Sequence, residues 1–242
     1  MEGPGVYLIK EKLSFLKGQK ILSVSGNTRE NKKILINKKI NNIFSHGKKL
    51  IFELDDFYLV IHFLMYGTYS IDKKIKNKKI RLSLKFKNNK VYFYNNSVKI
   101  FNKKDLFFNE RNDIMSKNFD YQLAIYKILK SNELIVDTLI NQEIFAGVGN
   151  IIKNEALFNS KIHPLSISSK IPLNKLEILI DKVLGFSRIF YEVRKKGQRL
   201  RNFCNVYGRK FCLRCKSKIN IKYLGKFKRK TFYCENCQKL YK

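Results

Sequence analysis

The chain has 242 residues, of which 44% are hydrophobic, so it can bury a core as one large domain or as two smaller ones. Its formal net charge is +31 at pH 7, which favours a polyanion as partner and makes nucleic acid the first candidate. No apolar run is long enough to span a bilayer and no basic amphipathic helix indicates binding to a lipid surface, so we expect no membrane role. An AT-rich coding bias would explain part of the lysine content.

The first predicted element is an amphipathic helix that starts near Pro4, a residue suited to a first helical turn, and ends near Gly18. Its apolar residues recur at spacings of three and four: Val6, Ile9, Leu13 and Leu16. The first twenty residues are rich in charge and contain no apolar segment of a secretory signal, so we expect a cytoplasmic, nucleoid-associated protein with reduced thiols.

The next hundred residues favour strands. Four β-rich runs cover residues 50–54, 58–63, 80–86 and 91–94. Turn residues separate them in pairs, Asp55-Asp56 in the first pair and Asn88-Asn89 in the second. This half of the chain is therefore predicted to be an antiparallel β-sandwich.

After a polar stretch at 109–118, predicted to be a linker, the hydrophobic period becomes helical from Tyr121 to about Val193. A glycine-containing break at 141–150 interrupts it, and a new helix is expected near Ile151. We therefore expect an α+β chain with three parts: a sandwich domain at 1–112, a helical domain at 113–203 and a finger at 204–242.

Four cysteines near the end form two CxxC pairs separated by eighteen residues: Cys212, Cys215, Cys234 and Cys237. This spacing is typical of a structural Zn²⁺ site, in which four thiolates close a tetrahedron. Two disulfides are the alternative, and the reducing compartment argues against them. Cys204 is the odd cysteine and is interpreted as a spare thiol.

The segment between the cysteine pairs is predicted to be a basic β-hairpin. Ile219, Ile221 and Tyr223 alternate along one arm, residues 231–233 form the other, and Gly225 lies in the turn. Three lysines and Arg229 follow that glycine, so the metal would stabilise a positively charged finger.

Five segments in order along the chain resemble the formamidopyrimidine-DNA glycosylase/endonuclease VIII family: 1–4, 45–50, 145–158 followed by 162–164, 206–210 and 231–234. The resemblance runs from end to end. It implies an N-terminal β-sandwich, a helix–two-turn–helix domain, a four-cysteine zinc finger and DNA in the cleft between the halves. It also implies a monomeric repair enzyme that uses no small-molecule cofactor, removes oxidised bases and cuts damaged or abasic DNA.

The resemblance assigns phosphate contacts to Asn150, in the turn with Gly149, and to Arg229, five residues before Cys234. Glycine lets a backbone approach a phosphate closely, a helix N-terminus attracts anions, and arginine is a forked donor. A glycine-rich turn with Asn150 as helix cap is the structural alternative. Lys48 matches a family lysine that contacts phosphate and assists the chemistry, with Lys49 as the ambiguity in register.

The segment 62–67 matches the family loop whose apolar residue fills the gap left by an extruded base. Met65 and Tyr66 are the candidates for that wedge. The alternative is that both pack in the core at a strand end.

The N-terminus departs from the family pattern, because Met1 stands where the family has its nucleophilic proline, and Gly5 replaces an acidic residue. The α-amine of Met1 can still form a Schiff base, since an α-amino group ordinarily titrates near 7.7–8.0. Glu2 is retained and would be the general acid at the sugar ring oxygen. Alternatively, the missing proline indicates a lyase that uses Lys48, or a protein that binds damaged DNA without cutting it.

Two departures from the formamidopyrimidine branch favour the endonuclease VIII-like branch, and hence oxidised pyrimidines or abasic sites over 8-oxoguanine. The segment 188–209 leaves little room for the loop that caps a flipped purine, and residues 95–101 lack an Arg-Arg-Phe sequence. An RNA-binding zinc-ribbon protein is a weaker alternative that rests on charge alone.

Overall fold

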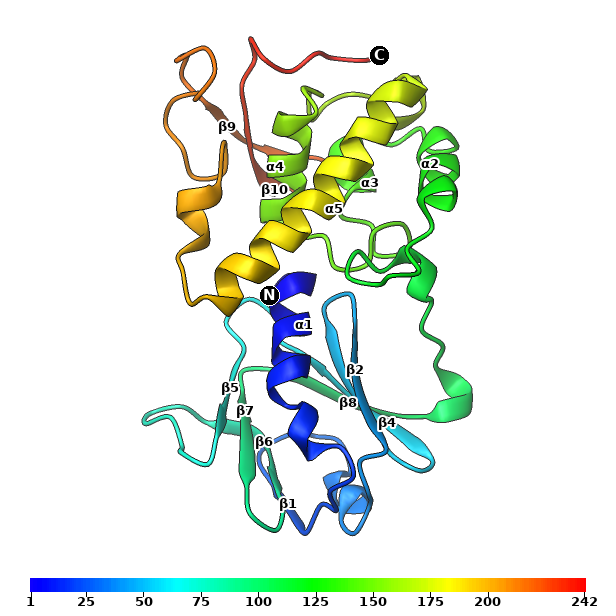
Figure 1. Ribbon diagram of the computed structural model, residues 1–242, viewed down its shortest axis with the longest axis vertical. Helices are drawn as coiled ribbons and strands as arrows, with labels where there is room; N and C mark the ends of the chain where they lie inside the picture. The colour runs from blue at the N-terminus through cyan, green and yellow to red at the C-terminus, as the bar shows by residue number, and fades with distance from the viewer. The chain divides into compact units, whose positions relative to one another are not determined.

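The computed structural model describes all residues from 1 to 242, which form two compact units (Figure 1). The sandwich unit consists of Met1 and Val6–Phe108, and the helical unit of Glu2–Gly5 and Asn109–Lys242. The chain therefore enters the helical unit for four residues directly after Met1. The finger lies in the same unit as the helices.

The sandwich unit holds two four-stranded sheets in which every pairing is antiparallel. The order of the first sheet is β1 (Ser23–Ser25), β6 (Ile80–Lys85), β7 (Lys90–Tyr94) and β5 (Thr68–Ile71). The order of the second is β2 (Asn42–His46), β3 (Lys49–Glu53), β4 (Phe57–His62) and β8 (Ser97–Asn102). This arrangement confirms the predicted antiparallel sandwich.

Aromatic and aliphatic side chains from both sheets fill one core. Phe52 of β3 meets Phe93 of β7 edge-to-face, with 6.1 Å between ring centroids, as offset aromatic pairs prefer. Helix α1 (Gly3–Lys12), the 3-10 turn Ser14–Leu16 and the residue between them add Val6, Ile9, Leu13 and Leu16 to this core. The predicted apolar stripe is confirmed, although the α-helix ends at Lys12, before Gly18.

Four strands were not expected: β1, β2, β5 and β8. They lack the long apolar runs that identified β3, β4, β6 and β7. All four residues of β5 are half-buried, and β1 reads Ser-Val-Ser. Strands β1, β2, β5 and β8 are the edges of the two sheets. An edge strand needs less apolar surface, because it is paired on one side only.

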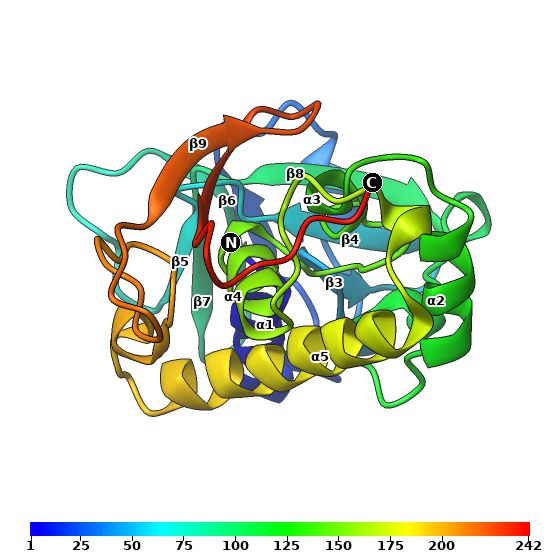
Figure 2. The ribbon, with the colours of Figure 1, turned by 90° about the horizontal axis from the view of Figure 1, so that it is seen from above.

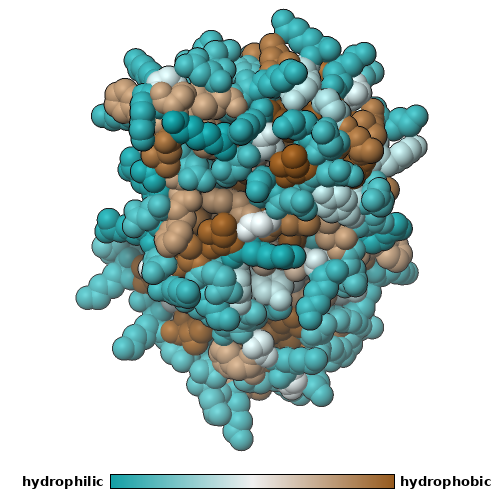
Figure 3. All heavy atoms as spheres, turned by 45° about the horizontal axis from the view of Figure 1, so that its top comes forward, coloured by the Kyte–Doolittle hydropathy of each residue, from teal (hydrophilic) through white to brown (hydrophobic).

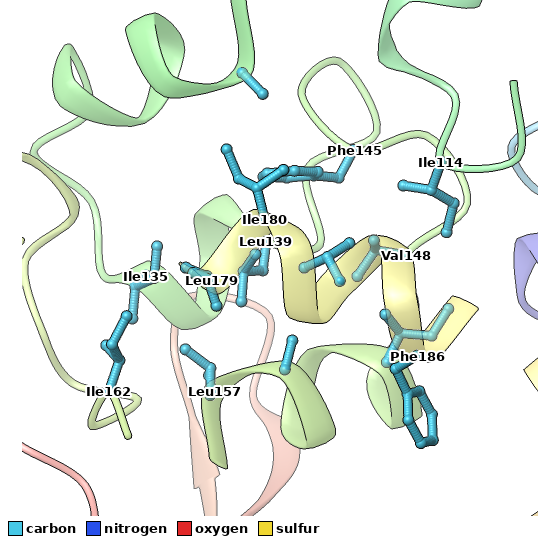
Figure 4. Packing of buried hydrophobic residues seen from close by; sticks show 14 of the residues in the cluster. Ile114, Ile135, Leu139, Phe145, Val148, Leu157, Ile162, Leu179, Ile180 and Phe186 are labelled. Carbon is cyan, nitrogen blue, oxygen red and sulfur yellow. The ribbon is translucent and has the colours of Figure 1, made fainter. Parts of the chain in front are cut away.

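The helical unit contains α2 (Tyr121–Leu129), α3 (Ile135–Thr138), α4 (Asn150–Asn159) and α5 (Leu173–Lys195). Asp120 caps α2 by accepting a hydrogen bond from the Leu123 N–H (2.8 Å). Figure 4 shows the shared core, where Leu179 and Ile180 of α5 lie near Leu139 and Phe145. Further 3-10 turns of this unit cover Glu110–Asn112, Ser168–Lys170 and Leu200–Phe203, and those of the sandwich unit cover Lys32–Leu35 and Lys103–Asp105.

The predicted linker at 109–118 is wrong for its middle part. Asn112 and Asp113 are buried, and Asp113 forms a parallel bridge with Ala146. The Ala146 N–H donates to the Asn112 carbonyl oxygen (2.8 Å), and the Ile114 N–H donates to that of Ala146 (3.1 Å). Polar residues led to the linker interpretation, but their backbone is paired with the turn that precedes α4.

The finger is a two-stranded hairpin of β9 (Asn220–Leu224) and β10 (Arg229–Tyr233), as predicted. Gly225 lies in its turn with φ +74°, a left-handed conformation that favours glycine. Helix α4 lies between α5 and this hairpin (Figure 2). The finger has its own small core, which includes Phe158 of α4, Val206 and Phe232.

Hydrophilic residues cover most of the face shown in Figure 3, as the 50 lysines and arginines lead one to expect. None of the helices combines the length and the apolar character that crossing a membrane requires.

Candidate functional site

The first group of candidate residues surrounds the N-terminal amine in the sandwich unit. The α-amino group of Met1 donates a hydrogen bond to the Leu64 carbonyl oxygen. The Leu64 N–H in turn donates to Nδ1 of His62 (3.1 Å), at the end of β4. The amine is therefore tied to the loop that follows β4.

The pKa of His62 depends on the charged groups that lie near it. Burial lowers the pKa of His62 most, and the positive charges of the Met1 amine, Lys48 and Lys49 lower it further. Lys48 lies in the tight turn between β2 and β3, and Lys49 is paired with His62 across β3 and β4. The neutral imidazole fits its role as acceptor from Leu64, so three amines and one uncharged histidine lie at this end of the sandwich.

The loop after β4 presents Met65 and Tyr66 to solvent, with 68% and 75% of their surface exposed. Leu64 adopts φ +48°, and the Gly67 N–H closes the turn on the Phe63 carbonyl oxygen (2.7 Å). A Cβ at Gly67 would lie 2.0 Å from that oxygen, so the turn requires glycine. The alternative that Met65 and Tyr66 pack in the core is wrong, and their role as a wedge stays a prediction.

The second group lies in the helical unit, where the carboxylate of Glu2 occupies the N-terminus of α4. One oxygen accepts from the Ile151 N–H (2.7 Å), and the other accepts from the Gly149 and Ile152 N–H groups (3.2 Å each). The Gly3 N–H also donates to the Gly147 carbonyl oxygen (2.9 Å). A helix N-terminus leaves such N–H groups unpaired and attracts negative charge, so Glu2 is an anchor as well as a candidate acid.

The structure explains why glycines occupy the turn before α4. Gly147 has φ +107°, which side-chain-bearing residues rarely adopt. A Cβ at Gly149 would lie 2.4 Å from Cγ and Cδ of Glu2. The close approach that Gly149 permits is thus that of Glu2, whereas sequence reasoning assigned it to a phosphate.

Asn150 begins α4 and reaches the finger. Its Nδ2 donates to the Lys230 carbonyl oxygen (2.8 Å), while its Oδ1 is buried without a hydrogen-bond partner. Arg229 precedes Lys230 at the start of β10 and is exposed. The structure therefore links the two residues expected to hold a phosphate through the backbone of β10.

The four predicted metal ligands converge. Their sulfur atoms all lie within 4.8 Å of one another, with 3.8 Å between Cys212 and Cys237 and 3.5 Å between Cys215 and Cys234. Thiolates at about 2.3 Å from a tetrahedral Zn²⁺ are about 3.8 Å apart, whereas a disulfide requires about 2.05 Å. All five cysteines are free thiols, so the cluster fits a metal and the disulfide alternative is wrong. Cys204 is buried outside the cluster.

Sequence reasoning missed several polar residues that build the helical unit. Buried Glu155 of α4 accepts hydrogen bonds from the backbone N–H groups of Asn205, Val206 and Tyr207 at 2.7–3.0 Å. Burial raises the pKa of its carboxyl group. Lys153 of α4 and Asp137 of α3 are also buried. Their partners lie fifty or more residues away in the chain, so no local pattern could reveal them.

Comparisons with known proteins agree with this fold. Residues 1–101 match the model of the formamidopyrimidine-DNA glycosylase N-terminal domain, and residues 112–197 match that of the formamidopyrimidine-DNA glycosylase H2TH domain. The solved complex between Lactococcus lactis Fpg and DNA that contains an abasic site has a TM-score of 0.87 at 25% identity and covers 99% of this chain and 100% of that one. A complex of MutM with DNA containing carbocyclic 8-oxo-G has a TM-score of 0.88 at 26% identity, with 99% and 100% coverage.

The formamidopyrimidine-DNA glycosylase of Mycoplasmopsis pulmonis is 32% identical over 231 residues, which are 85% of this chain and 82% of the relative. Endonuclease 8-like 3 of Mus musculus is 37% identical over 128 residues, 52% of this chain but only 21% of that protein, so the chain matches about a fifth of that relative. The chain belongs to the formamidopyrimidine-DNA glycosylase/endonuclease VIII family. This confirms the expected α+β fold of sandwich, helix–two-turn–helix domain and cysteine finger.

Proposed function

We propose that this protein is a DNA glycosylase and abasic-site lyase of base-excision repair, with damaged or abasic DNA as its partner. The observation that carries the proposal is the anchoring of Glu2 by three backbone N–H groups at the N-terminus of α4, directly after the residue that bears the α-amine. Binding alone does not require an anchored carboxylate on the residue that follows the α-amine, whereas Schiff-base chemistry needs both groups.

In the proposed reaction, the neutral Met1 amine attacks C1′ of the damaged nucleotide, and the bond between C1′ and the base breaks. The nitrogen then loses a proton, which Glu2 passes to the sugar ring oxygen as the bond between that oxygen and C1′ opens. The product is a protonated Schiff base that joins Met1 to C1′. Strand scission follows by elimination of the 3′ phosphate from that intermediate.

The other candidate residues would hold the substrate. Arg229 grips a phosphate beside the lesion, and Asn150 contributes its second amide hydrogen, since an amide nitrogen has two and Lys230 takes one. Lys48 contacts the backbone near the reacting amine. Met65 and Tyr66 fill the gap left by the extruded base, which their exposure permits.

We infer that the metal of the finger is Zn²⁺, held by Cys212, Cys215, Cys234 and Cys237. Zinc joins the chain before β9 to the chain after β10 at the open end of the hairpin and thereby stabilises the strand that carries Arg229. It has no step in the reaction. The enzyme acts as a monomer and needs no small-molecule cofactor.

We also propose that oxidised pyrimidines are better substrates than 8-oxoguanine. The chain between α5 and the finger is held close to α4, because Glu155 binds the backbone of Asn205, Val206 and Tyr207. A segment fixed in this way has little conformational freedom to form a cap over a flipped purine.

A lesion panel tests the proposal. Duplexes with an oxidised pyrimidine, with 8-oxoguanine and with an abasic site are incubated with the protein, and strand scission is measured. The proposal predicts scission of the first and third, with weaker scission of the second. Scission of the abasic duplex alone would favour a lyase without glycosylase activity, which Met1 in place of proline suggests. Tight binding without any scission would favour a non-catalytic binder.

A further inference from the structure

Strand β10 is fixed to one face of α4 by three polar side chains. Asn150, Lys153 and Asn154 are spaced i, i+3 and i+4, so they share a helix face. The contacts join Asn150 Nδ2 to the Lys230 carbonyl oxygen (2.8 Å), Lys153 Nζ to Thr231 Oγ1 (3.0 Å) and the Phe232 N–H to Asn154 Oδ1 (2.8 Å). Their partners are the three residues directly after Arg229, so this face of α4 fixes the strand that presents the finger arginine.

Lys153 is the unusual member of this set, because it is a lysine with no exposed surface. A buried ammonium is costly unless it is paired. Three charged groups face Lys153: Arg229 from β10, Asp137 from α3 and Glu2 from the N-terminal segment. Burial, and to a lesser extent the positive charge of Arg229, lowers the pKa of Lys153 to about 7, while the two carboxylates oppose the shift.

Asp137 connects the same lysine to the hairpin turn. Its Oδ2 accepts from the Lys226 N–H (3.0 Å), and a Cβ at Gly225 would lie 2.3 Å from its Oδ1. A second contact, between Lys226 Nζ and Glu133 Oε1 (2.6 Å), holds the turn from outside. Lys153 therefore shares its surroundings with two carboxylates, of which Asp137 holds the hairpin turn and Glu2 binds the N-terminus of α4.

We propose that Lys153 is a positioning residue, a buried amine behind Arg229 that fixes β10 on α4 and takes up a proton when a DNA phosphate binds Arg229. The inference rests on the proposed DNA contact of Arg229. Lys153 itself does not touch the substrate; it acts through the strand and through its charge.

The direction of the coupling follows from electrostatics. In the free protein, the charge of Arg229 disfavours a proton on Lys153. A phosphate bound by Arg229 offsets that charge, so the protonated form of Lys153 becomes easier to hold. Binding that favours protonation must weaken as pH rises through the pKa of the free protein, which is about 7 for Lys153. A shift of one pKa unit on binding corresponds to about a tenfold loss of affinity across the transition.

The test measures the affinity for a duplex with a tetrahydrofuran abasic analogue from pH 6 to pH 8.5 at constant ionic strength. We compare the wild type with Lys153→Met, which keeps the length of the side chain without its charge, and with Lys182→Met, which removes one charge at an exposed position of α5. Arg229→Ala is the second test variant, because an exposed arginine can be removed without loss of the fold. Circular dichroism confirms folding at each pH.

We expect the wild type and Lys182→Met to lose affinity in parallel as pH rises. Lys153→Met should bind more weakly than the wild type at pH 6. Its loss of affinity between pH 6 and pH 8.5 should be smaller than that of the wild type by a factor of up to about ten. The affinity of Arg229→Ala should depend less on pH in the same way. Adding Lys153→Met to Arg229→Ala should change affinity little further.

A folded Lys153→Met or an Arg229→Ala that keeps the full wild-type pH slope would overturn the inference and leave the proposed function standing. A wild type that does not bind the duplex at any pH would overturn both. A purely structural lysine would change stability in Lys153→Met without flattening the pH profile.

Discussion

The Glu2→Gln substitution tests the anchoring of the N-terminal segment on α4. Glutamine keeps the shape of Glu2 but has one acceptor oxygen in place of two, while three N–H groups at the N-terminus of α4 donate to the carboxylate. At least one of these N–H groups loses its partner and faces an amide NH₂ instead. The favourable charge at the helix N-terminus is lost as well.

The magnitude follows from these two losses. An unpaired, partly buried N–H costs about 1–3 kcal/mol, and a charge at a helix N-terminus contributes about 0.3–1 kcal/mol. We therefore expect the free energy of unfolding to fall by about 2 kcal/mol. Urea denaturation measures this directly, with the m-value expected to stay constant. Glu143→Gln is the control, since Glu143 is exposed and should change stability by less than about 0.5 kcal/mol.

An unchanged stability of Glu2→Gln would refute the anchoring role. Scission is then assayed well below the unfolding transition, where both variants are folded. Loss of scission there, with abasic-DNA affinity retained, assigns the proton transfer to Glu2. Full scission by the folded variant would contradict that assignment.

Three further predictions concern the metal, a buried charge and the wedge. Chelation of the metal should unfold the finger and abolish DNA binding, because the four cysteines join the chain before β9 to the chain after β10; full affinity in chelator would contradict this. Above pH 7 the folded chain releases the proton of Lys153, whereas the unfolded chain keeps it. The free energy of unfolding should therefore rise by about 1.5 kcal/mol from pH 7 to pH 8.5 through this group. Lys153→Met should lack this increment in urea titrations, and equal pH slopes would refute it. Replacing Met65 and Tyr66 by alanine should leave stability within about 0.5 kcal/mol, because both are exposed, and weaken binding to abasic-site DNA about tenfold; an equal loss on undamaged duplex would argue against a wedge.

The elements that could be predicted are those with a local signal. Strands β3, β4, β6 and β7 carry long β-rich runs, and the CxxC pairs specify their own geometry through spacing alone. The apolar stripe of α1 indicated the correct buried face. The residues of the helix break before α4 were identified correctly, although the anion that occupies its N–H groups was not.

The features that could not be predicted depend on contacts between distant parts of the chain. Glu2 meets amides 147 to 150 residues away, and a carboxylate second in a chain gives no sign of that partner. Lys153 is hidden among 50 lysines and arginines, where a buried lysine looks like any exposed one. The asparagines of 109–118 suggested a linker because composition does not show which backbone groups are paired.

The most direct test of the account is borohydride trapping on an abasic-site duplex, followed by peptide mapping of the cross-link. Borohydride reduces a Schiff base to a stable amine and so fixes the nucleophile in place. The account predicts a covalent adduct at the α-amine of Met1. An adduct at Lys48 would move the nucleophile and leave the N-terminus as an anchor. No adduct at all, with binding intact, would contradict the proposed lyase.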